Sequence, residues 1–215
     1  MEDLPQLLTS MKIGAERIRN LVTSLRNFSR MDEAEVKGVN LDEGIESTLM
    51  ILQNRLKGSK SNPAIQIVKN YGELPLVECY PGPLNQVLMN LIANAIDAVQ
   101  ERQEQETEVF QGRIMIEMQM LNSEWIEIII ADNGTGISEE VRSQMFNPFF
   151  TTKPPGKGTG FGLAISYSII VERHQGRLEC ESELGHGSRF RIKIPLRQKV
   201  SYTSRAWDEV HRMVG

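Results

Sequence analysis

A row of polar side chains recurs at helical spacing between residues 86 and 97 of this 215-residue sequence. Gln86, Asn90 and Asn94 are spaced four residues apart. Asp97 follows three residues later, so all four side chains share one helix face. Amides are poor helix formers, and their oxygens are hard neutral ligands that suit a Mg²⁺ ion carrying phosphate oxygens and water. On this segment alone, a solvated helix face remains the alternative interpretation.

A second candidate is ADNGTGIS at residues 131–138, which follows an isoleucine-rich strand pattern. The strand is strongly apolar, so Asp132 emerges at the edge of a core, where a buried carboxylate needs a hydrogen-bond donor. The exocyclic amine of adenine would provide one, and Gly134 and Gly136 would let the backbone approach a flat base. An ordinary turn is the alternative interpretation of this short pattern.

The glycine-rich stretch TTKPPGKGTGFGLAIS, residues 151–166, matches neither the Walker A loop nor the dinucleotide-binding pattern. It runs directly into a helix expected to start near Phe161. Free N–H groups and a partial positive charge at a helix N-terminus favour an anion, so polyphosphate is the expected occupant. The residues expected around it are Gly158, Thr159, Gly160 and Gly162, with Lys153 and Lys157 adding positive charge.

Between these motifs lies MFNPFF, residues 145–150, with three phenylalanines in a polar and glycine-rich region. Either these rings pack in the core, or they anchor a mobile flap. The stretch 147–160 holds three prolines and three glycines, which favours a flap that a ligand orders.

The elements that must position these motifs begin with a heptad seam on one long helix over the first thirty residues. Its members are Leu4, Leu7, Met11, Gly14, Ile18, Leu21, Leu25 and Phe28. A lone helix cannot bury such a stripe, so a dimeric bundle is favoured over packing on its own domain. The polar stretch 30–40, with Gly38, is expected to be a hinge.

The remaining pattern predicts an α+β fold: a two-layer α/β sandwich with helices on one face of a mixed, mostly antiparallel sheet. Helices are expected at 41–57, 81–103 and 161–174, strands at 64–72, 113–121 and 124–132, and a hairpin at 176–195 that turns at 185–187. A short helix of unclear purpose is expected in 198–215.

Composition excludes several classes of function. A net charge of −4 gives no electrostatic reason to expect nucleic acid as a partner. No apolar run approaches the roughly 18 residues of a membrane span, so a cytoplasmic location is expected. Cys79 and Cys180 fit no metal spacing and are expected to be buried thiols.

In order and spacing, NLIANAIDA, DNGTGI, FNPFFTTK and GKGTGFGLAIS resemble the N, G1, F and G2 boxes of the GHKL ATP-binding fold, and more narrowly those of sensor histidine kinases. The resemblance covers residues 40–196 and ends with GHGSRF, in which Ser188 stands where threonine is commoner. It implies three parts: a partial dimerisation and phosphotransfer helix at 1–37, the ATP-binding catalytic domain at 38–197, and a tail at 198–215.

The resemblance also implies roles for individual residues. Asn94 would be the main Mg²⁺ ligand with Asn90 assisting, and Asp132 would accept the adenine amine. The flap 147–160 would close over the triphosphate. The full set implied for ATP is Asn90, Asn94, Asp97, Asp132, Gly134, Gly136, Ile137, Thr152, Lys153, Lys157, Gly158, Thr159, Gly160, Phe161, Gly162, Leu163 and Ser188, with Asn90 and Gln86 as candidate catalytic residues.

Asn90 stands where the ATP-hydrolysing relatives carry a glutamate that activates water. An amide is no general base, so phosphoryl transfer from ATP to a histidine is expected rather than efficient hydrolysis. Two alternatives remain open: a nucleotide-responsive interaction module without turnover, and a GHKL-type ATPase. A GHKL serine kinase is disfavoured by the N-terminal helix.

None of the three histidines, His174, His186 and His211, has the sequence context of a phosphoacceptor. The resemblance therefore implies that the acceptor helix lies outside this chain, which would be unable to phosphorylate itself. The partners it implies are that acceptor helix, a downstream response regulator, and a second copy of the chain through the N-terminal helix.

Overall fold

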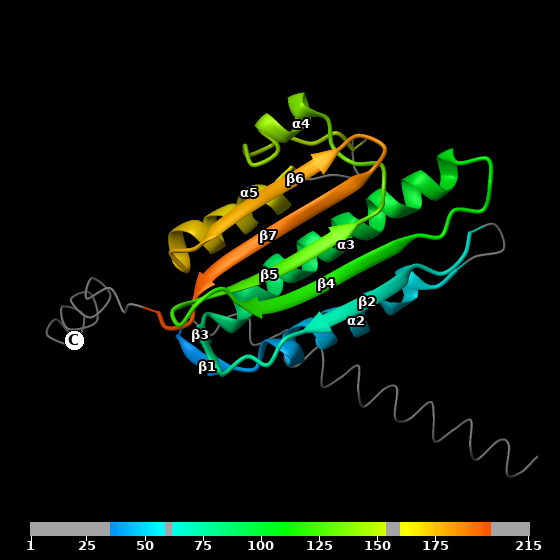
Figure 1. Ribbon diagram of the computed structural model, residues 1–215. Helices are drawn as coiled ribbons and strands as arrows, with labels where there is room; N and C mark the ends of the chain where they lie inside the picture. Colours follow the sequence, from blue (N-terminus) through cyan, green and yellow to red (C-terminus); the bar gives the residue numbers. More distant parts are fainter. Residues whose placement is uncertain (1–34, 59–61, 154–159, 199–215) are drawn as a thin grey trace, which may run out of the picture.

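The computed structural model describes residues 35–58, 62–153 and 160–198, and its centre is a five-stranded sheet in the order β2-β4-β5-β7-β6 (Figure 1). Only the pair β2 and β4 is parallel, and the other neighbours are antiparallel. The strands are β2 (Gln66–Tyr71), β4 (Arg113–Met120), β5 (Trp125–Asp132), β6 (Arg177–Glu183) and β7 (Gly187–Pro195).

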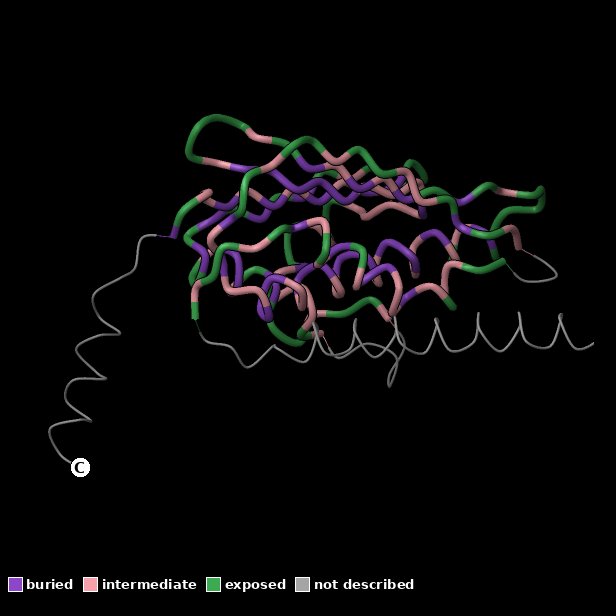
Figure 2. The backbone as a smooth tube through the Cα atoms, turned by 90° about the horizontal axis from the view of Figure 1, so that it is seen from below, coloured by how far each residue is buried: buried purple, intermediate pink, exposed green. Residues whose placement is uncertain are grey.

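The helices of the second layer lie on one face of this sheet (Figure 2). They are α2 (Leu41–Leu56), α3 (Pro81–Gln105) and α5 (Gly162–Ser168), which continues as the π-helical turn η2 (Ile169–Arg173). The predicted two-layer sandwich with a mixed, mostly antiparallel sheet is therefore confirmed. Within the described residues, no helix combines the length and apolar character that crossing a bilayer requires.

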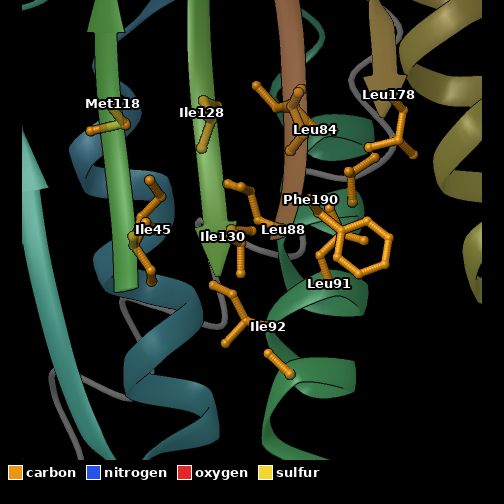
Figure 3. Close-up of a cluster of buried hydrophobic side chains, with 14 of the residues drawn as sticks. Ile45, Leu84, Leu88, Leu91, Ile92, Met118, Ile128, Ile130, Leu178 and Phe190 are labelled. Atoms are coloured by element: carbon orange, nitrogen blue, oxygen red, sulfur yellow. The ribbon is translucent and has the colours of Figure 1, made fainter. Parts of the chain in front are cut away.

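The core lies between the two layers, where helix and strand side chains meet at their own periodicities (Figure 3). Ile114, Ile116 and Met118 alternate inward along β4, as a strand with one covered face requires. Leu84, Leu88 and Leu91 on α3 are spaced four and three residues apart and are fully buried on the sheet side of that helix. Because α3 turns this stripe to the sheet, its polar row at residues 86–97 faces away from the core and remains partly exposed.

Capping residues mark where the first helices begin. The side chain of Asn40 accepts a hydrogen bond from the Asp42 backbone N–H at 2.9 Å, and Asp42 lies in the first turn of α2 as predicted. Pro81 opens α3, a position where the missing N–H of proline loses no helical bond.

Three small elements were absent from the sequence prediction. Strands β1 (Lys37–Val39) and β3 (Val77–Cys79) form a separate two-stranded antiparallel sheet, and α4 (Glu139–Gln144) follows β5. β1 includes Gly38, so the end of the stretch expected to be a hinge is a paired strand. The heptad helix and most of the tail fall on 1–34 and 199–215, outside the described residues, so those predictions and the proposed domain boundaries stay predictions.

The two cysteines are free and buried, as predicted. Burial raises the pKa of both thiols to about 12, so both are protonated at neutral pH.

His174 connects the end of η2 to the start of α3. Its ring is fully buried, with Nε2 accepting the Tyr80 backbone N–H at 3.0 Å and Nδ1 lying 2.8 Å from the Ile169 carbonyl oxygen. The neutral imidazole with its proton on Nδ1 satisfies both bonds, whereas a protonated ring has no acceptor for Tyr80. Burial accordingly lowers the pKa of His174 below its ordinary value of 6.5.

His174→Gln should lower the free energy of unfolding by about 2 kcal/mol at pH 7.5, because a buried ring that makes two hydrogen bonds is lost. The unfolded chain binds a proton at this histidine more readily than the folded one. The stability that neutral His174 provides is therefore present above pH 6.5 and is lost as the pH falls through the lowered folded pKa. Urea unfolding at pH 7.5 and 5.5 should show the difference between wild type and variant shrinking at the lower pH. The exposed His186 provides the control, since His186→Gln should change stability by less than about 0.5 kcal/mol at either pH.

Candidate active site

A cavity of about 810 Å³ opens where α3, the end of β5 and the β6–β7 turn meet. Nine of the residues selected from the sequence line it: Asn94, Asp97, Asp132, Gly136, Ile137, Thr152, Lys153, Leu163 and Ser188. These residues come from five separate motifs, which the fold brings to a single site of the size that small-molecule ligands occupy.

Asp132 is the last residue of β5, and its carboxylate is held from two sides. Oδ1 accepts the Gly134 backbone N–H at 2.8 Å, and the backbone of Ser188 on the neighbouring strand also bonds to the side chain. Burial nevertheless raises the pKa of Asp132 to about 6, since these two donors offset only part of the desolvation. Such a carboxylate gains from a further donor, which is what the exocyclic amine of a purine offers.

The opposite wall of the cavity carries a charged cluster built on α3. The Lys153 ammonium donates to Asp97 Oδ2 at 2.6 Å and to Asn94 Oδ1 at 3.2 Å. The other oxygen of Asp97, Oδ1, forms an ion pair with Arg55 from the last turn of α2. Asn94 Oδ1 thus already accepts a bond from a cation.

Asn90 lies one turn before Asn94 and contacts α5 rather than the cavity. Its amide nitrogen donates to the Gly162 carbonyl oxygen at 3.2 Å and to Ser166 Oγ at 3.3 Å. It therefore ties α3 to the start of α5, and its single oxygen Oδ1 is the atom left for a ligand. Gln86, a further turn away, does not line the cavity.

Two of the selected glycines are required by packing within the protein. A Cβ on Gly134 would lie 2.6 Å from the Ala98 backbone on α3. Gly136 has φ +71°, and a Cβ there would lie 2.0 Å from the Glu183 carbonyl oxygen. These close approaches join the loop after β5 to α3 and to the β6–β7 turn, and only Gly136 of the two also lines the cavity.

The phenylalanine motif closes onto the glycine-rich motif. Phe149 N–H donates to the Gly160 carbonyl oxygen at 3.0 Å, and the rings of Phe149 and Phe161 lie 4.6 Å apart. Phe146 and Phe150 pack against the core, which agrees with the first interpretation of this motif. Phe149 is 75% exposed and is the one ring of the three that is free to anchor a flap. Gly160, Phe161 and Gly162 lie beside the cavity without lining it, and Lys157, Gly158 and Thr159 fall outside the described residues.

Comparison with known proteins agrees with this geometry. Residues 80–198, more than half of the chain, match the family of histidine kinase-, DNA gyrase B- and HSP90-like ATPases. The chain belongs to this family. Its fold is that of the solved catalytic domain of histidine kinase ThkA, with a TM-score of 0.61 and 30% identity over 75% of this chain and 97% of that one.

Curated relatives place this catalytic domain with those of sensor kinases. Sporulation kinase E of Bacillus subtilis is 28% identical over 85% of this chain, and the signal transduction histidine-protein kinase AtoS of Escherichia coli is 31% identical over 87%. The chain spans only 23% and 28% of the length of these two relatives. It therefore contains a catalytic domain of the histidine-kinase type, which is an ATP-binding domain.

Several residues that line the cavity of this histidine-kinase-type domain were not predicted from the sequence. Ala98, Arg102 and Gln105 line the cavity from the same face of α3 as Asn94, and extending the same helical spacing would have found them. Leu184 and Gly185, in the β6–β7 turn, reach the cavity only because Gly185 N–H donates to the Thr135 carbonyl oxygen at 2.7 Å. No local pattern indicates that contact.

The oxygen donors at Asn94 fit a hard divalent cation bound together with a phosphate. Among the described residues, no cluster of three or more histidine, cysteine or acidic side chains could hold a metal by itself. The amide oxygen of Asn94, beside the Asp97 carboxylate, is the donor set suited to Mg²⁺ that keeps water and phosphate ligands.

Proposed function

We propose that this chain binds Mg·ATP in the cavity and transfers the γ-phosphoryl group to a histidine on a phosphoacceptor helix outside the chain. The observation that carries the proposal is that Asp132, Asn94 and Lys153 line one cavity from three separate elements. They combine a partly buried carboxylate for the base with an amide oxygen and an ammonium for the phosphates.

Adenine would lie against the end of β5, with its exocyclic amine donating to Asp132 and with Gly136 and Ile137 along its plane. The triphosphate would then run toward α5, close to Leu163, Thr152 and Lys153. The backbone around the cavity would support this pose at five further residues: Gly134, Gly160, Phe161, Gly162 and Ser188. Lys157, Gly158 and Thr159 complete the proposed phosphate contacts.

Asn94 would hold Mg²⁺, with Asn90 assisting through its Oδ1. The ion would neutralise charge on the β- and γ-phosphate oxygens. The residues of the chain would bind and align the nucleotide, and Lys153 would supply positive charge.

Transfer is favoured over hydrolysis because no carboxylate stands one turn before Asn94. The Asn90 amide, which donates to Gly162 and Ser166, cannot take a proton from water. Gln86, proposed as a second catalytic residue, likewise offers no base.

The proposed acceptor is none of this chain's histidines. Both ring nitrogens of His174 are engaged in a buried site, so it is closed to phosphorylation. His186 lies in the β6–β7 turn beside Glu183. His211 is outside the described residues. We propose a response regulator as the next partner, a homodimer formed through the N-terminal helix, and action in the cytoplasm.

The test supplies the acceptor in trans. The chain is mixed with Mg·[γ-³²P]ATP and a separately purified phosphotransfer hairpin from a sensor kinase, and phosphohistidine is followed as acid-labile, alkali-stable label. We expect label on the hairpin, none on the chain alone, and none with Asp132→Ala. A hairpin whose acceptor histidine is replaced by glutamine is the matched control.

Two other outcomes would contradict the proposal. Tight ATP binding without label on hairpins from several sensor kinases would indicate a nucleotide-responsive module. Steady phosphate release well above the background of the Asp132→Ala variant would indicate an ATPase instead.

A further inference from the structure

Arg55 is a charged residue beside the cavity that neither the motifs nor the comparisons single out. It lies in the last turn of α2, 42 residues before its partner Asp97. The side chain of Gln100 donates to the Arg55 carbonyl oxygen at 3.0 Å, so the end of α2 is tied to α3 beside the ion pair.

Asp97 is shared by two cations, one on each carboxylate oxygen. Arg55 occupies Oδ1, and the Lys153 ammonium occupies Oδ2 at 2.6 Å. The same ammonium reaches Asn94 Oδ1 at 3.2 Å. Lys153 therefore bonds to the amide oxygen at which Mg²⁺ is proposed to bind, so ion and ammonium compete for Asn94.

We propose that Arg55 is a positioning residue for nucleotide binding, and that it acts through Asp97 on Lys153. When Mg·ATP enters, Lys153 leaves Asp97 and Asn94 for the phosphates, and Arg55 remains as the counter-ion of Asp97. This inference rests on the proposed function and extends it to a residue outside the cavity lining.

The physical reason is that an uncompensated carboxylate beside a triphosphate is unfavourable in two ways. Without Arg55, Asp97 would hold Lys153 as its one cation and would resist its transfer to phosphate. After the transfer, the bare carboxylate would repel the nucleotide. Both penalties depend on the negative charge of Asp97, so removing that charge should remove the need for Arg55.

The test is a double-mutant cycle on the full 215-residue chain, read by calorimetric titration with Mg²⁺ and a non-hydrolysable ATP analogue. We expect Arg55→Gln to weaken binding about 10-fold, a modest effect because solvent screens an ion pair whose side chains are 37% and 39% exposed. In the D97N background the same change should matter less than about 2-fold. Arg55→Lys, which keeps the charge, should recover most of the loss.

The control is Lys69→Gln, which breaks the Lys69–Glu46 ion pair between β2 and α2 and should leave the dissociation constant unchanged. An equal loss from Arg55→Gln in both backgrounds would overturn the inference, because Arg55 would then act on the nucleotide or the fold directly. Wild-type affinity in Arg55→Gln would overturn it too. If the wild-type chain binds no analogue at all, it is the proposed function that fails.

Discussion

Asp132→Asn should weaken Mg·ATP binding about 100-fold while leaving the fold intact. Oδ1 is committed to the Gly134 N–H, so the asparagine would turn its NH₂ group toward the cavity, opposite the amine of adenine. The change replaces a charge-assisted hydrogen bond with two opposed donors, a difference of about 3 kcal/mol. Titration calorimetry measures the loss directly.

A purine nucleoside triphosphate that lacks the exocyclic amine separates this role from a general loss of the site. It should bind wild type about as weakly as ATP binds the variant, and the variant should barely distinguish the two ligands. Glu179→Gln, which removes an exposed carboxylate paired with Lys193, is the matched control. Equal discrimination between the ligands in wild type and Asp132→Asn would contradict the assignment.

The pH dependence of ATP binding should also report the role of Asp132. The pKa of Asp132 is raised to about 6, so the ionised form that adenine requires is lost as the pH falls from 7 to 5. Affinity should drop about 10-fold over that range in wild type and remain flatter in Asp132→Asn. Without nucleotide, the folded protein disfavours the ionised form of Asp132, whereas the unfolded chain keeps the ordinary pKa of 3.8. The contribution of this group to the free energy of unfolding therefore increases as the pH falls through 6. This pH-dependent change in stability should be absent from Asp132→Asn, because an amide does not titrate in this range.

Asn94→Ala should lower phosphotransfer to an acceptor hairpin about 1000-fold. The change removes the amide oxygen of Asn94 from the cavity, and with it the proposed ligand of the ion that would neutralise the transferring group. Nucleotide binding should fall less, because Asp132 and the base pocket are untouched. Single-turnover transfer and calorimetry, each with and without Mg²⁺, measure the two effects.

The diagnostic result is the loss of magnesium dependence. In wild type, chelating Mg²⁺ should weaken ATP binding, whereas in Asn94→Ala the two conditions should give nearly the same affinity. Asn70→Ala removes an amide that donates to Glu117 at 3.0 Å on the strand pair β2–β4, and it should behave as wild type. An Asn94→Ala variant that keeps the wild-type response to Mg²⁺ would place the ion elsewhere.

Local patterns were sufficient for much of the fold. The alternation along β4, the stripe on α3 and the Gly185–Gly187 turn each depend on neighbours within a few residues, and the sequence states those directly. The missed elements β1, β3 and α4 are three to six residues long, too short for any periodicity to develop. β1 and β3 are stabilised by each other across some forty residues of chain, which local propensity cannot indicate.

The sequence alone indicated part of the chemistry of the candidate site, because spacing on one helix puts Asn90, Asn94 and Asp97 on one face and a strand end places Asp132 at the edge of the core. Tertiary structure alone decided how they are used. It turned Asn90 toward α5, joined Arg55 to Asp97, and brought the tip of the β6–β7 turn against Thr135. Those contacts depend on strand order and on how α2 and α3 pack, both of which are set by the burial of the whole apolar core.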